Sequence, residues 1–388
     1  MQKKYFYHLS IILIITFFYA GCSENVENKS LNIDITSYRT DTNLLRSSKI
    51  YDSVVYIPLE TNSRNLIAKI DQLEIESERY IVLDKDSKTI SIYTKTGKFI
   101  NLIENVNTWN FWIDNHLIKF FNSKKANEIL AYNLDGEEVS KSKSNHYFKN
   151  IIELDSISHA EYYGYDRSNY APYNSHNLGI FKGKEYKFFL NNENILLSKE
   201  NVISTGRCFF RSDSITLFTP EYSTEIFSIT PTSCTKKITI KIDKEASIPL
   251  SDANFLKDLK YNIKHGKYIV GLNNCFEANG VVSFQVVSTF GFFNFIYNIN
   301  QQKLLKTNEI FKYSVFKQEN PIGIATLGVD NGSFISSMPA SFFVKMLRKS
   351  AFKESIAPFA TQYWSELNKV TVHSNPVLIK AYPKKNWL

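Results

Sequence analysis

The stretch "TISIYTKTGKFI", residues 89–100, alternates apolar and polar side chains on both sides of a Lys-Thr-Gly turn. Such alternation around a glycine-containing turn is typical of a β-hairpin. A second stretch, "EILAYNLDGEEV", matches the first at an offset of 39 residues, so that Gly97 aligns with Gly136 and Tyr93 with Tyr132. A sequence period of this size indicates an array of similar structural units.

The first repeat divides into four segments that have the length and alternation of β-strands, "LIAKIDQLEIES", "RYIVLDKD", "TISIYTKTG" and "KFINLIE". Four antiparallel strands joined by tight turns make one blade of a β-propeller. A second blade follows as "WNFWIDN", "HLIKFFNS", "EILAYNLDG" and "EEVSKS", and weaker copies continue along the chain. We predict an all-β fold, with residues 49–388 forming a six-bladed β-propeller.

Two segments interrupt this strand pattern. "SDANFLKDLKYNIKHG", ahead of blade five, predicts a short helix with Ser251 or Asp252 as its N-cap and Gly266 at its end. In blade six, a group of apolar residues recurs at helical spacing and predicts a helix that packs as a cap. These residues are Phe342, Phe343, Met346 and Leu347.

Blade six is one strand short, and one strand-like segment near the start of the domain has no blade. This segment is "SVVYIPLE", residues 53–60, and we expect it to pair with "NPVLIKAYP", residues 375–383. Pairing between the two ends of the domain would close the ring and remove an unpaired sheet edge.

The N-terminus, "MQKKYFYHLSIILIITFFYAGCS", combines two lysines with an apolar run of 12 residues and a following Cys22. This layout is typical of a secretory signal, whereas a membrane-spanning helix, the alternative, needs about 20 apolar residues. We predict a signal peptide over residues 1–21. The polar segment over residues 22–48 reads as a flexible tether.

The "YAGC" motif resembles the lipobox of bacterial lipoproteins, which implies that Cys22 carries diglyceride and palmitate chains and becomes the mature N-terminus. The segments "SVVYIPLETNSRNLIAKIDQLEIESERYIVLDKDSKTISIYTKTGKFI" and "NPVLIKAYPKK" together resemble the six-bladed, NHL-like propeller lipoproteins of Gram-negative bacteria. This resemblance implies a lipid-anchored protein of the cell envelope, at the outer membrane and facing the periplasm or the surface. It brings no catalytic residues.

The charge pattern does not predict nucleic acid binding. The formal charge is +8, and removing Lys3 and Lys4 with the signal leaves +6, without any long basic block. The cysteines Cys208, Cys234 and Cys275 lack metal-site spacing. We expect these three cysteines to be buried free thiols. The alternative is one disulfide, which the oxidising environment outside the cytoplasm would permit.

No motif for catalysis, a metal or a cofactor is found. His159 and His176 flank an aromatic loop, but two histidines without a third ligand favour surface residues over a metal site. Asp84 and Asp86 resemble a carboxylate pair for acid–base chemistry, yet they follow the strand "YIVL", where aspartates commonly form turns.

The loop between His159 and His176 is the candidate ligand-binding segment. Tyrosines can stack on a ligand and donate hydrogen bonds, and loops often carry function. The alternative is that the rings pack on a neighbouring blade. The candidate residues are Tyr162, Tyr163, Tyr165, Asp166, Arg167, Asn169, Tyr170 and Tyr173.

Three functions are consistent with these observations. The leading hypothesis is a membrane-anchored propeller that binds an envelope protein or glycan without catalysis. The second is an enzyme acting on polysaccharide or peptide, with a site assembled from separate loops. The third is a structural scaffold of an envelope complex, which would expose an apolar patch.

Overall fold

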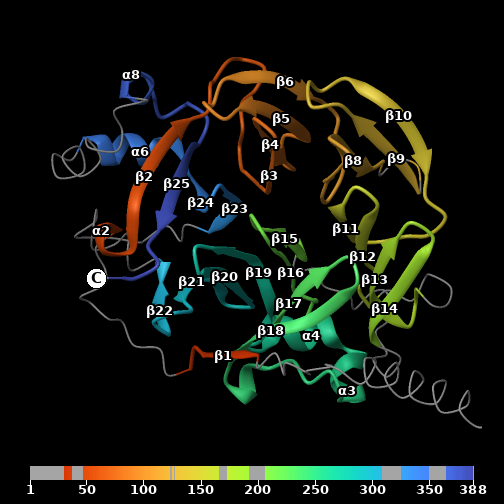
Figure 1. Ribbon diagram of the computed structural model, residues 1–388. Helices are drawn as coiled ribbons and strands as arrows, with labels where there is room; N and C mark the ends of the chain where they lie inside the picture. The colour runs from red at the N-terminus through yellow and green to blue at the C-terminus, as the bar shows by residue number, and fades with distance from the viewer. Residues whose placement is uncertain are drawn as a thin grey trace, which may run out of the picture.

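Six β-sheets are arranged as blades around a central axis in the computed structural model (Figure 1). In each blade the strand nearest the axis pairs antiparallel with the next strand, and the remaining strands continue outward. The all-β, six-bladed propeller predicted from the sequence is therefore confirmed. The structure describes residues 30–36, 47–122, 125, 127–165, 173–191, 206–307, 325–348 and 364–387.

Each blade contains four strands in this meander, and their bounds are as follows. Blade 1 contains β3 (Gln72–Glu76), β4 (Arg79–Asp84), β5 (Thr89–Thr94) and β6 (Phe99–Ile103). Blade 2 contains β7 (Trp112–Asp114), β8 (Leu117–Phe121), β9 (Glu128–Tyr132) and β10 (Glu138–Lys143). Blade 3 contains β11 (Asn150–Asp155), β12 (Ser158–Tyr162), β13 (His176–Lys182) and β14 (Glu185–Asn191).

Blades 4 to 6 follow the same order. Blade 4 contains β15 (Phe209–Arg211), β16 (Thr216–Phe218), β17 (Glu225–Thr230) and β18 (Ser233–Lys241). Blade 5 contains β19 (Ile269–Ala278), β20 (Val281–Ser288), β21 (Gly291–Asn298) and β22 (Lys303–Lys306). Blade 6 contains β23 (Thr326–Asp330), β24 (Ser333–Met338), β25 (Val377–Pro383) and β2 (Tyr51–Pro58).

The two hairpins that revealed the repeat have the same geometry. Gly97 and Gly136 have φ angles of 82° and 83°, in the region that side chains disfavour. The backbone N–H of Gly97 donates to the carbonyl of Thr94 at 2.9 Å, and that of Gly136 donates to Asn133 at 3.0 Å. Both glycines therefore occupy the same position in equivalent turns.

The ring closes as expected, because the early strand β2 completes the last blade. β2 pairs antiparallel with β25, and Ile57 lies opposite Leu378 in this ladder. Leu378 is fully buried in a cluster that also contains Ile57 and Leu73. The core of blade 6 is thus built from both ends of the domain.

Both helical insertions lie in the predicted segments, but the first, expected as one helix ending at Gly266, consists of two helices separated at Asp258. Asp252 caps α3 (Ala253–Lys257) by accepting two backbone hydrogen bonds, and Gly266 ends α4 (Leu259–His265). α6 (Ala340–Leu347) packs Phe343 and Met346 against the outer side of blade 6. The other short helices are α2 (Ser47–Ile50), η3 (Lys244–Ala246) and α8 (Trp364–Leu367). No helix in the described part of the chain is long and apolar enough to cross a membrane.

The predicted tether contains a strand that the sequence analysis missed. β1 (Leu31–Asp34) pairs in parallel with β18 at the outer edge of blade 4, and Ile33 is 2% exposed. The description of residues 22–48 as a flexible tether is wrong for these four residues, because two alternating apolar side chains suffice to extend an existing sheet. The predicted signal peptide and Cys22 lie outside the described residues.

We predict that Gly97→Ala destabilises the propeller far more than Gly183→Ala. Both glycines have positive φ angles. A Cβ at Gly97 would lie 2.2 Å from the carbonyl oxygen of Pro58, whereas a Cβ at Gly183 would have no atom within 4 Å. The backbone strain alone costs about 1–2 kcal/mol, and the clash should raise the cost at Gly97 to roughly 3 kcal/mol or more. Urea denaturation would measure both, and equal losses would contradict the contact.

Leu378→Asp should lower the stability of the whole domain, because Leu378 is fully buried in the closing ladder. Burying an unpaired carboxylate costs several kcal/mol or more. Val372→Asp is the matched control, since Val372 is 48% exposed. Thermal unfolding of both variants tests whether this ladder closes the ring. An unchanged melting temperature for Leu378→Asp would refute the closure.

Candidate functional site

A mostly buried ion pair crosses the central channel. Arg207, which precedes β15 of blade 4, forms an ion pair with Glu74 of blade 1 at 2.5 Å and donates to the carbonyl of Leu73 at 3.2 Å. Its guanidinium lies 5.7 Å from the ring of Phe210 and 5.9 Å from that of Phe276. Arg207 therefore links three blades near the axis. A cavity of about 20 Å³ remains beside it, enough for one water molecule.

A larger cavity of about 280 Å³ opens at one mouth of the channel. Its walls come from blades 1, 4, 5 and 6, chiefly from the innermost strands and the turns that follow them. Arg207 and Arg211 line both this cavity and the small inner one, so they form its floor. The exposed carboxylates of Glu78 and Asp213 lie at its rim.

The buried carboxylate in this mouth is held by lysines. Asp330 accepts from Lys95 at 2.5 Å and from Lys380 at 2.7 Å. Burial raises the pKa of Asp330, but the hydrogen bonds and charges of the two lysines outweigh it and lower the pKa below its ordinary value. Asp330 therefore stays ionised and joins blade 6 to blade 1.

Arg211 is the cation of this mouth that forms no ion pair within the described residues. Its Nη2 atom donates to the backbone carbonyl of Glu153 at 2.5 Å, which leaves the positive charge without a carboxylate. Asp213, two residues further on, accepts instead from the backbone N–H of Gly332. The floor of the mouth is thus positive and its rim negative.

The structure decides between the two alternatives for the tyrosine loop at three of its rings. Tyr162 and Tyr163 are fully buried and Tyr165 is 5% exposed. The Tyr162 hydroxyl donates to Glu221 at 3.3 Å, and the Tyr163 hydroxyl donates to Glu161 at 2.7 Å. The alternative is correct for these three rings, which pack in the blades and offer no stacking face to a ligand.

Of the other candidate residues in this loop, the structure describes only Tyr173. Tyr173 is half-buried and stacks on His146, with the ring centroids 4.2 Å apart. The remaining candidates lie outside the described residues; they are Asp166, Arg167, Asn169 and Tyr170.

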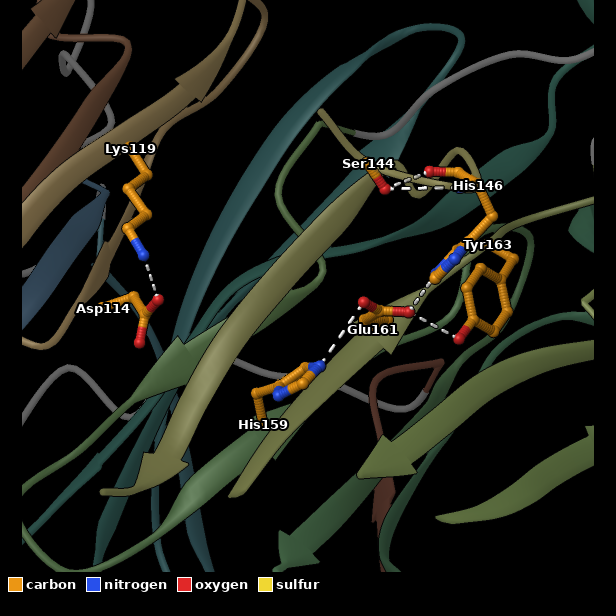
Figure 2. A network of polar contacts seen from close by, with 7 residues as sticks. All are labelled: Asp114, Lys119, Ser144, His146, His159, Glu161 and Tyr163. Carbon is orange, nitrogen blue, oxygen red and sulfur yellow. Dashed lines mark hydrogen bonds and ion pairs between the residues drawn. The ribbon is translucent and has the colours of Figure 1, made fainter. Parts of the chain in front are cut away.

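A buried carboxylate between blades 2 and 3 has partners that the sequence did not reveal (Figure 2). Glu161 accepts from His146 at 2.6 Å and from Tyr163 at 2.7 Å, and His159 lies 3.4 Å away. Burial raises the pKa of Glu161, but hydrogen bonds from both histidines and Tyr163, together with the His146 charge, hold the pKa at about 2. These hydrogen bonds hold the segment that follows β10, which contains His146, against strand β12, which contains Glu161.

The other expected residues have structural roles. His159 stacks on Phe181, whereas His176 lies against Phe188, so the two histidines have different partners. Asp84 accepts from the backbone N–H groups of Ala68 and Asp86, among others, which confirms its role in a turn. No group of three or more potential metal ligands occurs among the described residues.

The three downstream cysteines are free thiols. Cys208 and Cys275 are fully buried, as predicted, whereas Cys234 is only half-buried. Burial raises the pKa of the Cys234 thiol to about 12, so this side chain stays protonated.

Comparison with solved structures supports the fold. The chain is similar to a Bacteroides fragilis protein provisionally described as exported, with a TM-score of 0.69, 12% identity, and 91% of this chain and 99% of that chain covered. A member of the DUF4221 family from Bacteroides vulgatus has a TM-score of 0.48 and 10% identity, with 86% and 97% covered. No curated protein matches. A family model described as a domain of unknown function, DUF4934, matches residues 30–382, and the chain belongs to this family.

Proposed function

We propose that this protein is a lipid-anchored binding protein of the cell envelope, which captures a carboxylate-bearing ligand at the mouth of its channel without changing it chemically. The observation that carries the proposal is Arg211, a cation at the floor of a 280 Å³ cavity without a carboxylate partner in the described chain. A guanidinium can bind a carboxylate through two parallel hydrogen bonds.

The size and charge of the mouth define the ligand. A cavity of about 280 Å³ is close to the lower end of the range for small-molecule sites, roughly 300 Å³, so it would hold one terminal group of a larger molecule. Glu78 and Asp213 at the rim favour a hydrogen-bond donor next to that group, such as an amide N–H or a hydroxyl. A peptide end and a uronic acid both have this chemistry.

The geometry favours binding over catalysis. The two mostly buried carboxylates at this mouth, Glu74 and Asp330, are held in ion pairs with Arg207, Lys95 and Lys380, so they are not free to exchange protons as a general acid or base.

The lipobox-like sequence ending at Cys22 supports this location. Export is further supported by the likeness to the Bacteroides fragilis protein, whose description is also of an exported protein. Acyl chains on Cys22 would hold the propeller at a membrane, because two chains anchor a protein stably where one does so only marginally.

Arg211→Gln should weaken binding of carboxylate probes by about tenfold or more, because it removes a charge-assisted hydrogen bond. The probes are short peptides with a free or an amidated C-terminus, and oligogalacturonate against a neutral oligosaccharide, measured by calorimetry. Arg64→Gln, at an exposed arginine, is the matched control. If only the peptide with a free C-terminus binds better than its amidated form, the ligand is a peptide end. If only oligogalacturonate binds better than the neutral oligosaccharide, the ligand is a uronic acid. Equal binding of carboxylate and neutral probes, or full binding by Arg211→Gln, would refute the site.

Cys22→Ala should shift the protein from the membrane fraction to the soluble fraction of cells, because the polar segment after Cys22 has no apolar anchor of its own. Mass spectrometry of the wild-type N-terminal peptide should show the acyl chains. Ser23→Ala is the control, and membrane retention of Cys22→Ala would contradict lipid anchoring.

A further inference from the structure

One surface of the propeller combines exposed lysines with exposed aromatic rings. Lys260 and Lys264 lie one turn apart on α4, with Tyr261 between them in sequence. Leu259 and Ile263 of the same helix are buried, so the lysines point away from the core. The side chain of Tyr261 is 65% exposed.

Two phenylalanines extend this surface, Phe290 in the turn between β20 and β21 and Phe292 at the start of β21. Phe290 is 54% exposed and Phe292 is 63% exposed. The turn is fixed to the segment after α4, because Thr289 donates through its hydroxyl to the carbonyl of Gly266 and through its backbone N–H to Tyr268, both at 2.9 Å. The helix and the turn therefore form one continuous surface. We call it the α4 surface, and it consists of Lys260, Tyr261, Lys264, Lys267, Phe290 and Phe292.

The α4 surface carries a net positive charge. Residues 251–268 contain four lysines and two aspartates, which gives 4 − 2 = +2 with His265 neutral. One of the aspartates, Asp252, accepts hydrogen bonds from the N-terminus of α3. Lys260, Lys264 and Lys267 form no ion pair with other described residues, so their charges are available to an anionic partner.

The N-terminal chain restricts how far the α4 surface can lie from the anchoring membrane. β1 pairs with β18, and β18 leads through η3 into α3 and α4 (Figure 1). Cys22 precedes Leu31 by nine residues, a span of at most about 32 Å when fully extended. An acylated Cys22 would therefore keep the outer edge of blade 4, and the neighbouring helices, close to the lipid surface.

We propose that the α4 surface rests on the phosphate-bearing headgroups of the bilayer that holds Cys22. This inference depends on the lipid anchoring under the proposed function and adds an orientation to it. The lysines would pair with lipid phosphates, and the rings of Tyr261, Phe290 and Phe292 would lie at the boundary of headgroups and acyl chains, where aromatic and basic side chains bind membranes. Acyl chains alone fix a distance, whereas this second contact fixes which edge of the propeller faces the lipid.

The test uses the predicted mature chain, residues 22–388, with Cys22→Ala, so that binding relies neither on acyl chains nor on the apolar run of the signal peptide. The protein is floated with vesicles of phosphatidylglycerol and phosphatidylcholine. The surface variant adds Lys260→Glu, Tyr261→Ser and Lys264→Glu. The control variant instead adds Lys184→Glu, Tyr186→Ser and Lys187→Glu, which are exposed residues of the hairpin between β13 and β14 in blade 3. Thermal unfolding checks that both variants fold.

We expect the surface variant to lose about tenfold or more of its vesicle binding at low salt, given the contribution of each lysine near an anionic surface, and the control variant to lose none. Equal losses, or no loss in either variant, would overturn the proposal. Capture of a protein partner by the α4 surface, with no dependence on lipid charge, would overturn it as well.

A second measurement needs no variant. Lysine labelling of the wild-type full chain on the same vesicles, read by mass spectrometry, should protect Lys260 and Lys264 and leave Lys184 and Lys187 reactive. Equal labelling of all four lysines would overturn the orientation. The mass of the Cys22 peptide separates this failure from a failure of acylation, because it reports lipid attachment whatever the lysines do.

Discussion

The backbone ladder between β2 and β25 is the constraint on which the rest of the structure depends. It joins two segments from opposite ends of the domain, and Asn375 fixes the junction with its side chain, which is 1% exposed. Its Oδ1 accepts from the backbone N–H of Ile67 at 2.8 Å, and its Nδ2 donates to the carbonyls of Glu60 and Asn65 at 2.9 Å. Since every other blade is covalently linked only to its sequence neighbours, this junction keeps the first and last blades together.

A closed ring also explains the charged interior. The innermost strands converge, so side chains from separate blades meet near the axis, and Arg207 of blade 4 reaches the backbone of blade 1 at Leu73. Buried charges persist only when they are paired. Arg207 and Glu74 pair across the channel, as Asp330 and its lysines pair between blades 6 and 1. Arg211 departs from this pattern, which makes the mouth beside it the best place for a ligand.

The sequence predicted features encoded locally and missed those that depend on distant partners. The turns at Gly97 and Gly136 need glycine wherever the blades lie, so the repeat was visible. β1 was missed because four residues carry little periodicity, and its stability comes from the edge of β18. The sequence left open whether the Tyr163 ring is buried, because its burial depends on Glu161 and blade 2, and nothing in the spacing of charged residues could place Arg211 at the channel mouth.

The two proposed surfaces lie at opposite ends of one strand. α4 leads directly into the start of β19, whereas Phe276, near the end of that strand, lines the channel mouth. β19 has 10 residues, which at about 3.3 Å per residue separates its ends by roughly 30 Å. A propeller that rests on lipid through the α4 surface would therefore hold the mouth, with Arg211 at its floor, away from the bilayer. The positive floor would then meet ligands arriving from the aqueous side, beyond the Debye length of about 10 Å over which lipid charges act.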